Sequence, residues 1–463
     1  MPQPEDNKSW IENEFAQTKL KDPRQIRRVK TIAEDLMRQP QASINAASGS
    51  WAAAKAAYRF FASPIEADDL LSGHRQSTIQ RMRERPVVLA VQDTTTLNFT
   101  TQRAKQGLGS IGTNKSDNKG FYCHTTLAID PKAGALGVLD MQSYLRKEQP
   151  LKRGRTAEAT QRESVRWLKS LACCQQAAQS CGPATQIISV ADREADFYEF
   201  FAYAKKEAPQ VELLVRAQYD RELEEGRLFA QIREQPRLGT TEIEVPRSPG
   251  QASRTACLQI RAKVIRLKAP AHWRNAEQWP ELELWAIEAW EADAPETELA
   301  ICWRLLTTLP VEGFAEALEK ITYYCLRWTI EVWHKILKSG CKFEARQLES
   351  FPRLERVLRL DAIIAWRVLY LIGQGRAHPQ LDCTAVLETY EWKALYGFLK
   401  KAPPPNGQPP SLGEALLLVA RLGGFLARKS DGHPGPQVLW RGLSKLDNIA
   451  QAWLVFSSPE TCG

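Results

Sequence analysis

Four side chains between positions 324 and 338 could together bind a phosphate group and a metal ion. Tyr324, Arg327, Glu331 and Lys338 are separated by three, four and seven residues, so on a helix of 3.6 residues per turn they share an arc of roughly 60°. One carboxylate among two cations and a phenol offers an oxygen ligand to a divalent cation and three donors to phosphate oxygens. The same spacing also fits a solvated face with an Arg327 to Glu331 ion pair.

Two aspartates are the other candidates for this chemistry. Asp93 follows the apolar run PVVLAVQ, and Asp192 follows QIISVA, so each lies at the end of a predicted buried strand. A carboxylate at a strand end is presented at the edge of the sheet. We expect Asp93 and Asp192 to meet if their strands are neighbours.

The helix that must carry the charged row is predicted from residue 314 to residue 338. Its apolar residues recur at steps of three and four, which indicates one buried face. These residues are Phe314, Leu318, Ile321, Cys325, Trp328, Val332 and Ile336.

The order of the remaining elements indicates an α/β fold. Three strand-like segments with short links precede a helix, a strand ending at Asp192, a second helix and a fifth strand, VELLVRAQ. This is the order of the ribonuclease H-like fold, in which the first and fourth strands are neighbours. Residues 222–300 interrupt it with alternating segments that predict an antiparallel β insertion. We therefore expect a catalytic core over residues 71–372 and helical domains over 1–70 and 373–463.

Composition restricts the class of protein without defining it. The chain has 463 residues, 43% hydrophobic and 25% charged, with a net charge of +8, as in a globular protein that could bind a polyanion. No apolar run approaches the ~20 residues of a membrane span. The N-terminal residues lack the pattern of a secretory signal, so we expect a cytoplasmic location. None of the ten cysteines has the spacing of a zinc site.

Basic residues in the N-terminal region are the candidates for DNA contact. Arg24, Arg27 and Arg28 lie on a predicted helix that begins after Asp22-Pro23. A second predicted helix, WAAAKAAYRFF, carries Lys55, Tyr58 and Arg59. A helical module with basic faces could dock on DNA phosphates, or could equally be a helical cap with a solvated surface.

The complete set resembles the bacterial DDE transposases of the insertion-sequence type that carry the YREK signature and move by cut and paste. The segments QDTTTLNF, ADREADFY, WRLLT, RWTIEVWHK and ARLGGF resemble segments of those enzymes in the same order, and the resemblance covers nearly the whole chain. The insertion and the proline-rich linker KAPPPNGQPP depart from the family.

The resemblance implies specific roles. Asp93, Asp192 and Glu331 would be the metal-binding triad for two Mg²⁺ ions, which Mn²⁺ can replace. Tyr324, Arg327 and Lys338 would contact phosphates, and Trp303 would stack on a base flipped out near a hairpin. The N-terminal domain would bind double-stranded DNA at the terminal inverted repeats. The C-terminal domain would form a homodimer on two paired ends. The enzyme would act on the nucleoid and join the cleaved 3′ ends to target DNA.

Two alternatives remain at this point. One is a nuclease that cuts but does not join. The other is a DNA-binding repressor derived from a transposase.

Overall fold

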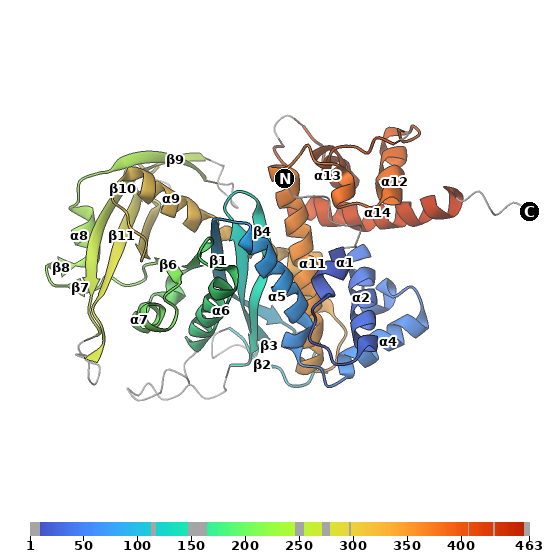
Figure 1. The fold of residues 1–463 in the computed structure, drawn as a ribbon, viewed down its shortest axis with the longest axis horizontal. Helices are drawn as coiled ribbons and strands as arrows, with labels where there is room; N and C mark the ends of the chain where they lie inside the picture. The colour runs from blue at the N-terminus through green and yellow to red at the C-terminus, as the bar shows by residue number, and fades with distance from the viewer. Residues whose placement is uncertain are drawn as a thin grey trace, which may run out of the picture.

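A computed structural model describes residues 10–112, 117–146, 164–245, 254–270, 278–295, 298–405, 407–428 and 431–457. Its centre is one sheet of ten strands in the order β2-β3-β1-β5-β6-β12-β11-β10-β9, with β4 paired to β3. Helical units lie beyond the β3 and β4 side of this sheet, and the insertion forms the opposite end (Figure 1). In the described residues, all cysteines are free and no helix is long and apolar enough to cross a membrane.

The core of the sheet has the ribonuclease H-like strand order. β1 (Val87–Asn98), β3 (Lys119–Asp130) and β4 (Gly134–Tyr144) form an antiparallel meander beside the short β2 (Gly109–Ser110). β5 (Gln186–Ala191) is parallel to β1, and β6 (Val211–Arg216) is parallel to β5. The expected fold class is confirmed, including the adjacency of the first and fourth core strands.

The insertion extends this sheet instead of folding apart from it. β12 (Cys302–Thr307) pairs antiparallel with β6 on one side and with β11 (Leu282–Glu291) on the other. β10 (Arg254–Leu267) and β9 (Gly239–Val245) continue the antiparallel order. The short helix α8 (Leu228–Arg233) packs on β10 and β11, and β7 (Glu222–Leu223) pairs with β8 (Gly226–Arg227).

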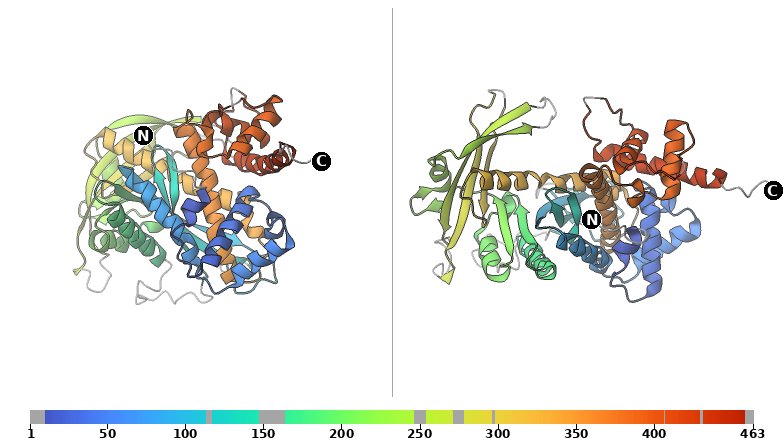
Figure 2. Two further views of the ribbon diagram at one scale, coloured as in Figure 1. Left: turned by 45° about the vertical axis from the view of Figure 1, so that its right-hand side comes forward. Right: turned by 45° about the horizontal axis from the view of Figure 1, so that its top comes forward.

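Helices cover both faces of the core. α5 (Ala67–Arg83), α6 (Val165–Cys181) and α7 (Tyr198–Glu207) bury one apolar cluster with the sheet. α9 (Phe314–Cys325), α10 (Trp328–Lys335) and the 27-residue α11 (Phe351–Ala377) bury a second cluster on the other face. Figure 2 shows α9 and α10, in gold, crossing from the insertion to the core.

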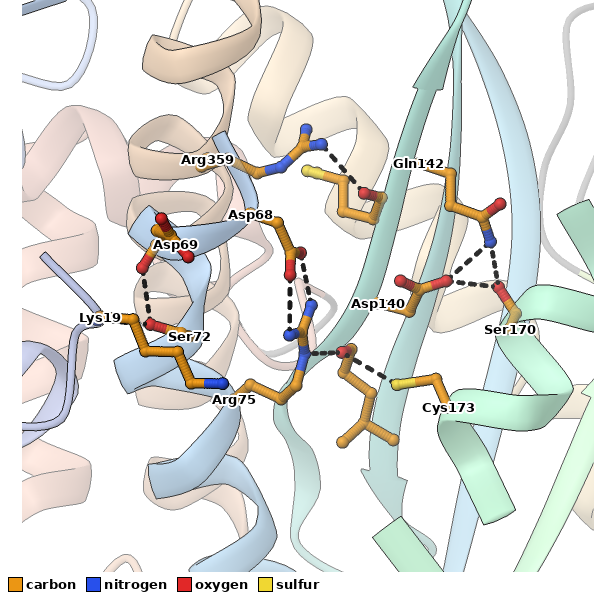
Figure 3. Close-up of polar contacts among 12 residues, drawn as sticks. Lys19, Asp68, Asp69, Ser72, Arg75, Asp140, Gln142, Ser170, Cys173 and Arg359 are labelled. Atoms are coloured by element: carbon orange, nitrogen blue, oxygen red, sulfur yellow. Dashed lines mark hydrogen bonds and ion pairs between the residues drawn. The ribbon is translucent and has the colours of Figure 1, made fainter. Parts of the chain in front are cut away.

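Polar contacts fix α5 to the edge of the core sheet (Figure 3). The Arg75 guanidinium donates to the backbone oxygen of Leu139 on β4 at 2.6 Å and to the Asp68 carboxylate at 2.7 and 3.1 Å. On the other side of β4, Ser170 of α6 donates to the Asp140 carboxylate at 2.8 Å. The Arg75 to Leu139 bond joins α5 to β4 and the Ser170 to Asp140 bond joins α6 to β4, so both helices are fixed to this strand.

The N-terminal unit contains α1 (Trp10–Phe15), α2 (Pro23–Arg38), α3 (Ile44–Ala47) and α4 (Trp51–Ala62). The predicted starts at Pro23 and Trp51 are confirmed, because the side chains of Asp22 and Ser50 cap these two helices. Arg346 ties the unit to the core: its guanidinium makes a buried ion pair with Asp361 at 2.8 and 2.9 Å and donates to the backbone oxygen of Ala42 at 2.6 Å.

The C-terminal unit contains α12 (Thr389–Lys400), α13 (Leu412–Leu422) and α14 (Pro436–Ser457), packed around the end of α11. α13 and α14 approach so closely that a Cβ on Gly442 would lie 1.9 Å from the backbone oxygen of Val419. Short 3₁₀ or π turns complete the chain at Arg193–Ala195, Ile336–Gly340, Phe343–Ala345 and Cys383–Ala385.

Candidate active site

Asp93 and Asp192 lie side by side on neighbouring parallel strands. The β1 to β5 register pairs Val91 with Val190, and each aspartate follows its valine by two residues. Because side chains alternate along a strand, both aspartates are on the face of the sheet to which the valines belong. That face packs against the cluster that includes α10 and α11.

The expectation that the first strand ends at Asp93 was wrong. β1 continues to Asn98, because β3 supplies antiparallel partners along that whole segment, including Thr125 opposite Asp93. Asp93 instead lies just beyond the end of the parallel pairing between β1 and β5, where the β5-facing edge of β1 has no partner strand among the described residues. Asp192 leaves β5 and caps a short 3₁₀ turn, accepting a hydrogen bond from the Glu194 backbone nitrogen at 2.9 Å.

Glu331 approaches this face from α10. Ile330 and Trp333 of the same helix are fully buried, which presses α10 onto the sheet and leaves Glu331 half-buried beside it. The Glu331 carboxylate is paired with the Arg327 guanidinium. The ion pair that the spacing allowed is therefore present, and it lies within the cluster of carboxylates and not on an open surface.

The electrostatics of Asp93 connect it with the other two acidic side chains. Burial raises the pKa of the Asp93 carboxyl to about 7; Arg327 opposes this rise, and the charges of Asp192 and Glu331 add to it. A buried carboxyl that resists ionisation in this way is stabilised by a proton or by a nearby cation. The arrangement is therefore suited to bind positive charge at its centre.

The predicted continuous helix over residues 314–338 is interrupted. α9 ends at Cys325, Leu326 and Arg327 form a turn, and α10 passes into a π turn at Ile336–Gly340. Backbone angles remain helical at Leu326 and Arg327, so α10 continues in nearly the same direction as α9. Arg327 and Glu331 remain neighbours at i, i+4, whereas Lys338 is displaced by the π turn.

The three predicted phosphate contacts surround the carboxylates. Tyr324 is buried in α9, and burial raises the pKa of its phenol although Arg216, which hydrogen-bonds to it, opposes the rise. Burial lowers the pKa of the Lys338 ammonium, while Glu344 and Asp93 among its neighbours oppose that shift. Arg327 and Lys338 therefore both bring positive charge close to Asp93.

Trp303 lies on β12, in the CWRLLT strand, opposite Ala289 of β11. Its ring centroid is 6.2 Å from that of Tyr324, with an angle of 60° between the ring planes. The indole is partly buried against the core. Through Tyr324 it is connected to the row of phosphate-binding candidates.

Two residues near the carboxylates escaped the prediction from the sequence. His334 Nδ1 lies 3.6 Å from an Asp93 carboxylate oxygen, and burial, with Lys338 and Arg327 nearby, lowers the pKa of the imidazole to about 3. His334 could have been found, because it follows Glu331 by three residues and so shares its face. Arg216, at the end of β6, gives no such signal in the sequence.

The N-terminal candidates lie on α2 and α4, which pack against each other. Arg24, Arg27, Lys55 and Arg59 are exposed, and Arg28 and Tyr58 are half-buried. The structure places none of them among the carboxylates, so the N-terminal unit presents a separate basic surface.

The geometry does not form a closed metal cage. Across the described residues, no three His, Cys, Asp or Glu side chains are arranged so that they could hold a metal ion. The Glu331 carboxylate is instead paired with Arg327. Asp93, Asp192 and Glu331 nevertheless supply the hard oxygen atoms that a divalent cation prefers, and the two aspartates lie on the sheet face against which α10 packs.

Comparisons with known proteins agree with this arrangement at both ends of the chain. Residues 7–65 match the transposase DNA-binding family model, and residues 363–457 match the model of the transposase Tn5 dimerisation domain. Together with the ribonuclease H-like core between them, these two domains support a DNA transposase.

Among solved structures, the chain is similar to a piggyBac transposase in a synaptic complex with hairpin DNA. The identity is 10%, the alignment covers 79% of this chain and 71% of that chain, and the TM-score is 0.37. A similarity of this size carries no detail of the site.

Proposed function

We propose that this protein is a DDE transposase that binds the terminal inverted repeats of its own element, pairs two ends, cleaves them and joins the 3′ ends to target DNA. The observation that carries the proposal is that Asp93 and Asp192 share the sheet face against which α10, with Glu331, packs, and that the charges of Asp192, Glu331 and Arg327 act on Asp93. The two matched transposase domains at the ends of the chain support it. Its place of action would be the bacterial nucleoid, in the cytoplasm.

Asp93, Asp192 and Glu331 would hold two Mg²⁺ ions, or Mn²⁺ in their place. Bound there, the metal supplies an activated water or 3′-hydroxyl and stabilises the leaving oxygen. The raised pKa of Asp93 supports this assignment, because its carboxylate needs a cation to be stable when ionised. Glu331 must first release Arg327, which frees the guanidinium.

The released Arg327 would bind the DNA backbone. A guanidinium can donate to two phosphate oxygens at once, whereas the Lys338 ammonium acts as a point charge. Tyr324 would add a phenol hydrogen bond to the same backbone. Trp303, 6.2 Å from the Tyr324 ring, would receive a base flipped from the end, which relieves the strain of a DNA hairpin.

The working form would be a homodimer on two DNA ends, paired through the C-terminal unit. Val455 and Phe456 at the end of α14 are 65% and 86% exposed, and Phe398 of α12 is 58% exposed. Phe398 and Phe456 line a hollow of about 480 Å³ between α12 and α14. An apolar surface of this kind is suited to burial against a second copy.

The experiment that tests the proposal uses duplexes with the inverted repeats that flank the gene. Asp93→Ala, Asp192→Ala and Glu331→Ala should each abolish Mg²⁺-dependent cleavage and leave end binding measurable. Glu316→Ala, an exposed acidic residue of α9, is the matched control and should cleave normally. Cleavage by any of the three triad variants would overturn the assignment.

A second measurement separates transposition from its alternatives. A precleaved end is incubated with a supercoiled plasmid and Mg²⁺, and joined product is quantified. Joining supports a transposase. Cutting without joining indicates a nuclease, and binding without cutting indicates a repressor.

A further inference from the structure

Trp51 is an exposed aromatic residue that contributes little to the packing of the fold. It occupies the first position of α4 and its side chain is 72% exposed, so it adds little to the core. The inner face of α4 is formed instead by Ala54, Ala57 and two phenylalanines. A large exposed indole in a DNA-binding unit is available for contact with a base.

The surroundings of Trp51 form a shallow binding surface. Lys55, one turn further along α4, places its ammonium 5.1 Å from the centre of the indole ring. Trp51, Lys55 and Tyr58 line a hollow of about 490 Å³ together with Asn45, Ser50 and Ala54. Arg59 follows at the next four-residue step and is also exposed. One stripe of α4 therefore carries an aromatic ring followed by two cations.

The connection before α4 resembles that of a helix-turn-helix. α3 ends at Ala47 and α4 begins at Trp51, and the three residues between them include Gly49 with φ +60°. This left-handed angle favours glycine, and short turns with glycine are common between the two helices of such motifs. In these motifs the N-terminal residues of the second helix contact base edges in the major groove.

We propose that α4 is the recognition helix of this chain and that Trp51 reads a thymine in the terminal repeat, by packing its indole against the C5 methyl group. Apolar contact with this methyl distinguishes thymine from the other bases in the major groove. Lys55 and Arg59 would bind the flanking phosphates. This inference rests on the proposed function, because it names the base that the end-binding domain recognises.

The proposal is tested by selection from a library of randomised DNA duplexes, without divalent metal, using the full chain. The wild type should enrich a motif with at least one fixed thymine that Trp51→Ala no longer requires. Replacing that thymine by deoxyuridine removes only the methyl group. It should weaken wild-type binding about fourfold, the value of one buried methyl group at ~0.8 kcal/mol, and leave Trp51→Ala binding unchanged.

Two control variants define the role of Trp51. Lys55→Ala should weaken binding to all sequences alike and reduce its salt dependence, as expected for a phosphate contact. Trp279→Ala removes another exposed indole, in the segment between β10 and β11, and should select the wild-type motif. Equal thermal unfolding of wild type and Trp51→Ala verifies folding, since the side chain is exposed.

The outcomes separate this inference from the proposed function. If Trp51→Ala selects the same motif with the same thymine requirement, the inference is wrong while end binding stands. Equal binding of the thymine and deoxyuridine duplexes by the wild type would also overturn it. If the wild type enriches no sequence, end recognition itself fails.

Discussion

Replacing Asp93 by asparagine should stabilise the metal-free protein at alkaline pH. The folded-state pKa of Asp93 is about 7, against an ordinary value of 3.8. At 1.36 kcal/mol per pKa unit, keeping this buried carboxyl ionised costs about 4 kcal/mol. Asparagine has nearly the same shape and no charge, so Asp93→Asn avoids that cost.

The sign of the effect follows from proton binding. Between pH 4 and pH 7 the folded protein holds the Asp93 proton more tightly than the unfolded chain, so wild-type stability falls as pH rises through this window. The contribution of Asp93 should fall by about 2.5 kcal/mol between pH 5 and pH 8. In Asp93→Asn that contribution to the pH dependence should be absent.

The assay is urea unfolding with EDTA, at pH 5 and pH 8, of wild type, Asp93→Asn and the control Asp117→Asn, whose aspartate is exposed in a loop. The difference in unfolding free energy between wild type and Asp93→Asn should change with pH, and the control should follow the wild type. Adding Mg²⁺ at pH 8 should stabilise the wild type and should leave the stability of Asp93→Asn unchanged. Parallel pH profiles for these two proteins would refute the argument.

Three other perturbations follow from the same structure. Arg327→Met removes a cation that lowers the pKa of Asp93. In this variant the pH range over which stability is lost, measured by urea unfolding, should extend above pH 7; the same pH range as in the wild type would contradict the coupling. Arg346→Met or Asp361→Leu should each cost about 3–5 kcal/mol, because one buried charge loses its partner, and the double variant should unfold at higher urea than either; additive losses would argue against the pair. Phe456→Asp should reduce paired-end complexes in gel shifts while single-end binding persists, and undiminished pairing would exclude this face.

Much of the core could be predicted from the sequence because its signals are local. Apolar runs predicted the strands, and the order of elements predicted the topology of the core sheet. The proximity of Asp93 and Asp192 then followed from the adjacency of β1 and β5. The four-residue step from Arg327 to Glu331 gave their contact directly. In each case a short period or a single topological rule was sufficient.

The remaining features depend on contacts that no local pattern contains. The end of β1 is set by β3, whose partner residues are far away in the chain. Arg216 reaches Tyr324 only because β6 and α9 come together in the fold. The break at Leu326 is invisible in the apolar periodicity, because both residues of the turn keep helical angles. Such features need the assembled tertiary structure.

The pairing of β12 with β6 has a consequence for the newly synthesised chain. β6 is complete long before β12, because the whole insertion is translated between them. During that interval the backbone hydrogen-bonding groups at the outer edge of β6 have no partner strand, and an open edge of this kind promotes aggregation. α10, with Glu331, follows β12 in the chain, so the third acidic residue is synthesised after the strand that closes this edge. Truncation within the insertion should therefore yield an aggregation-prone polypeptide that lacks Glu331.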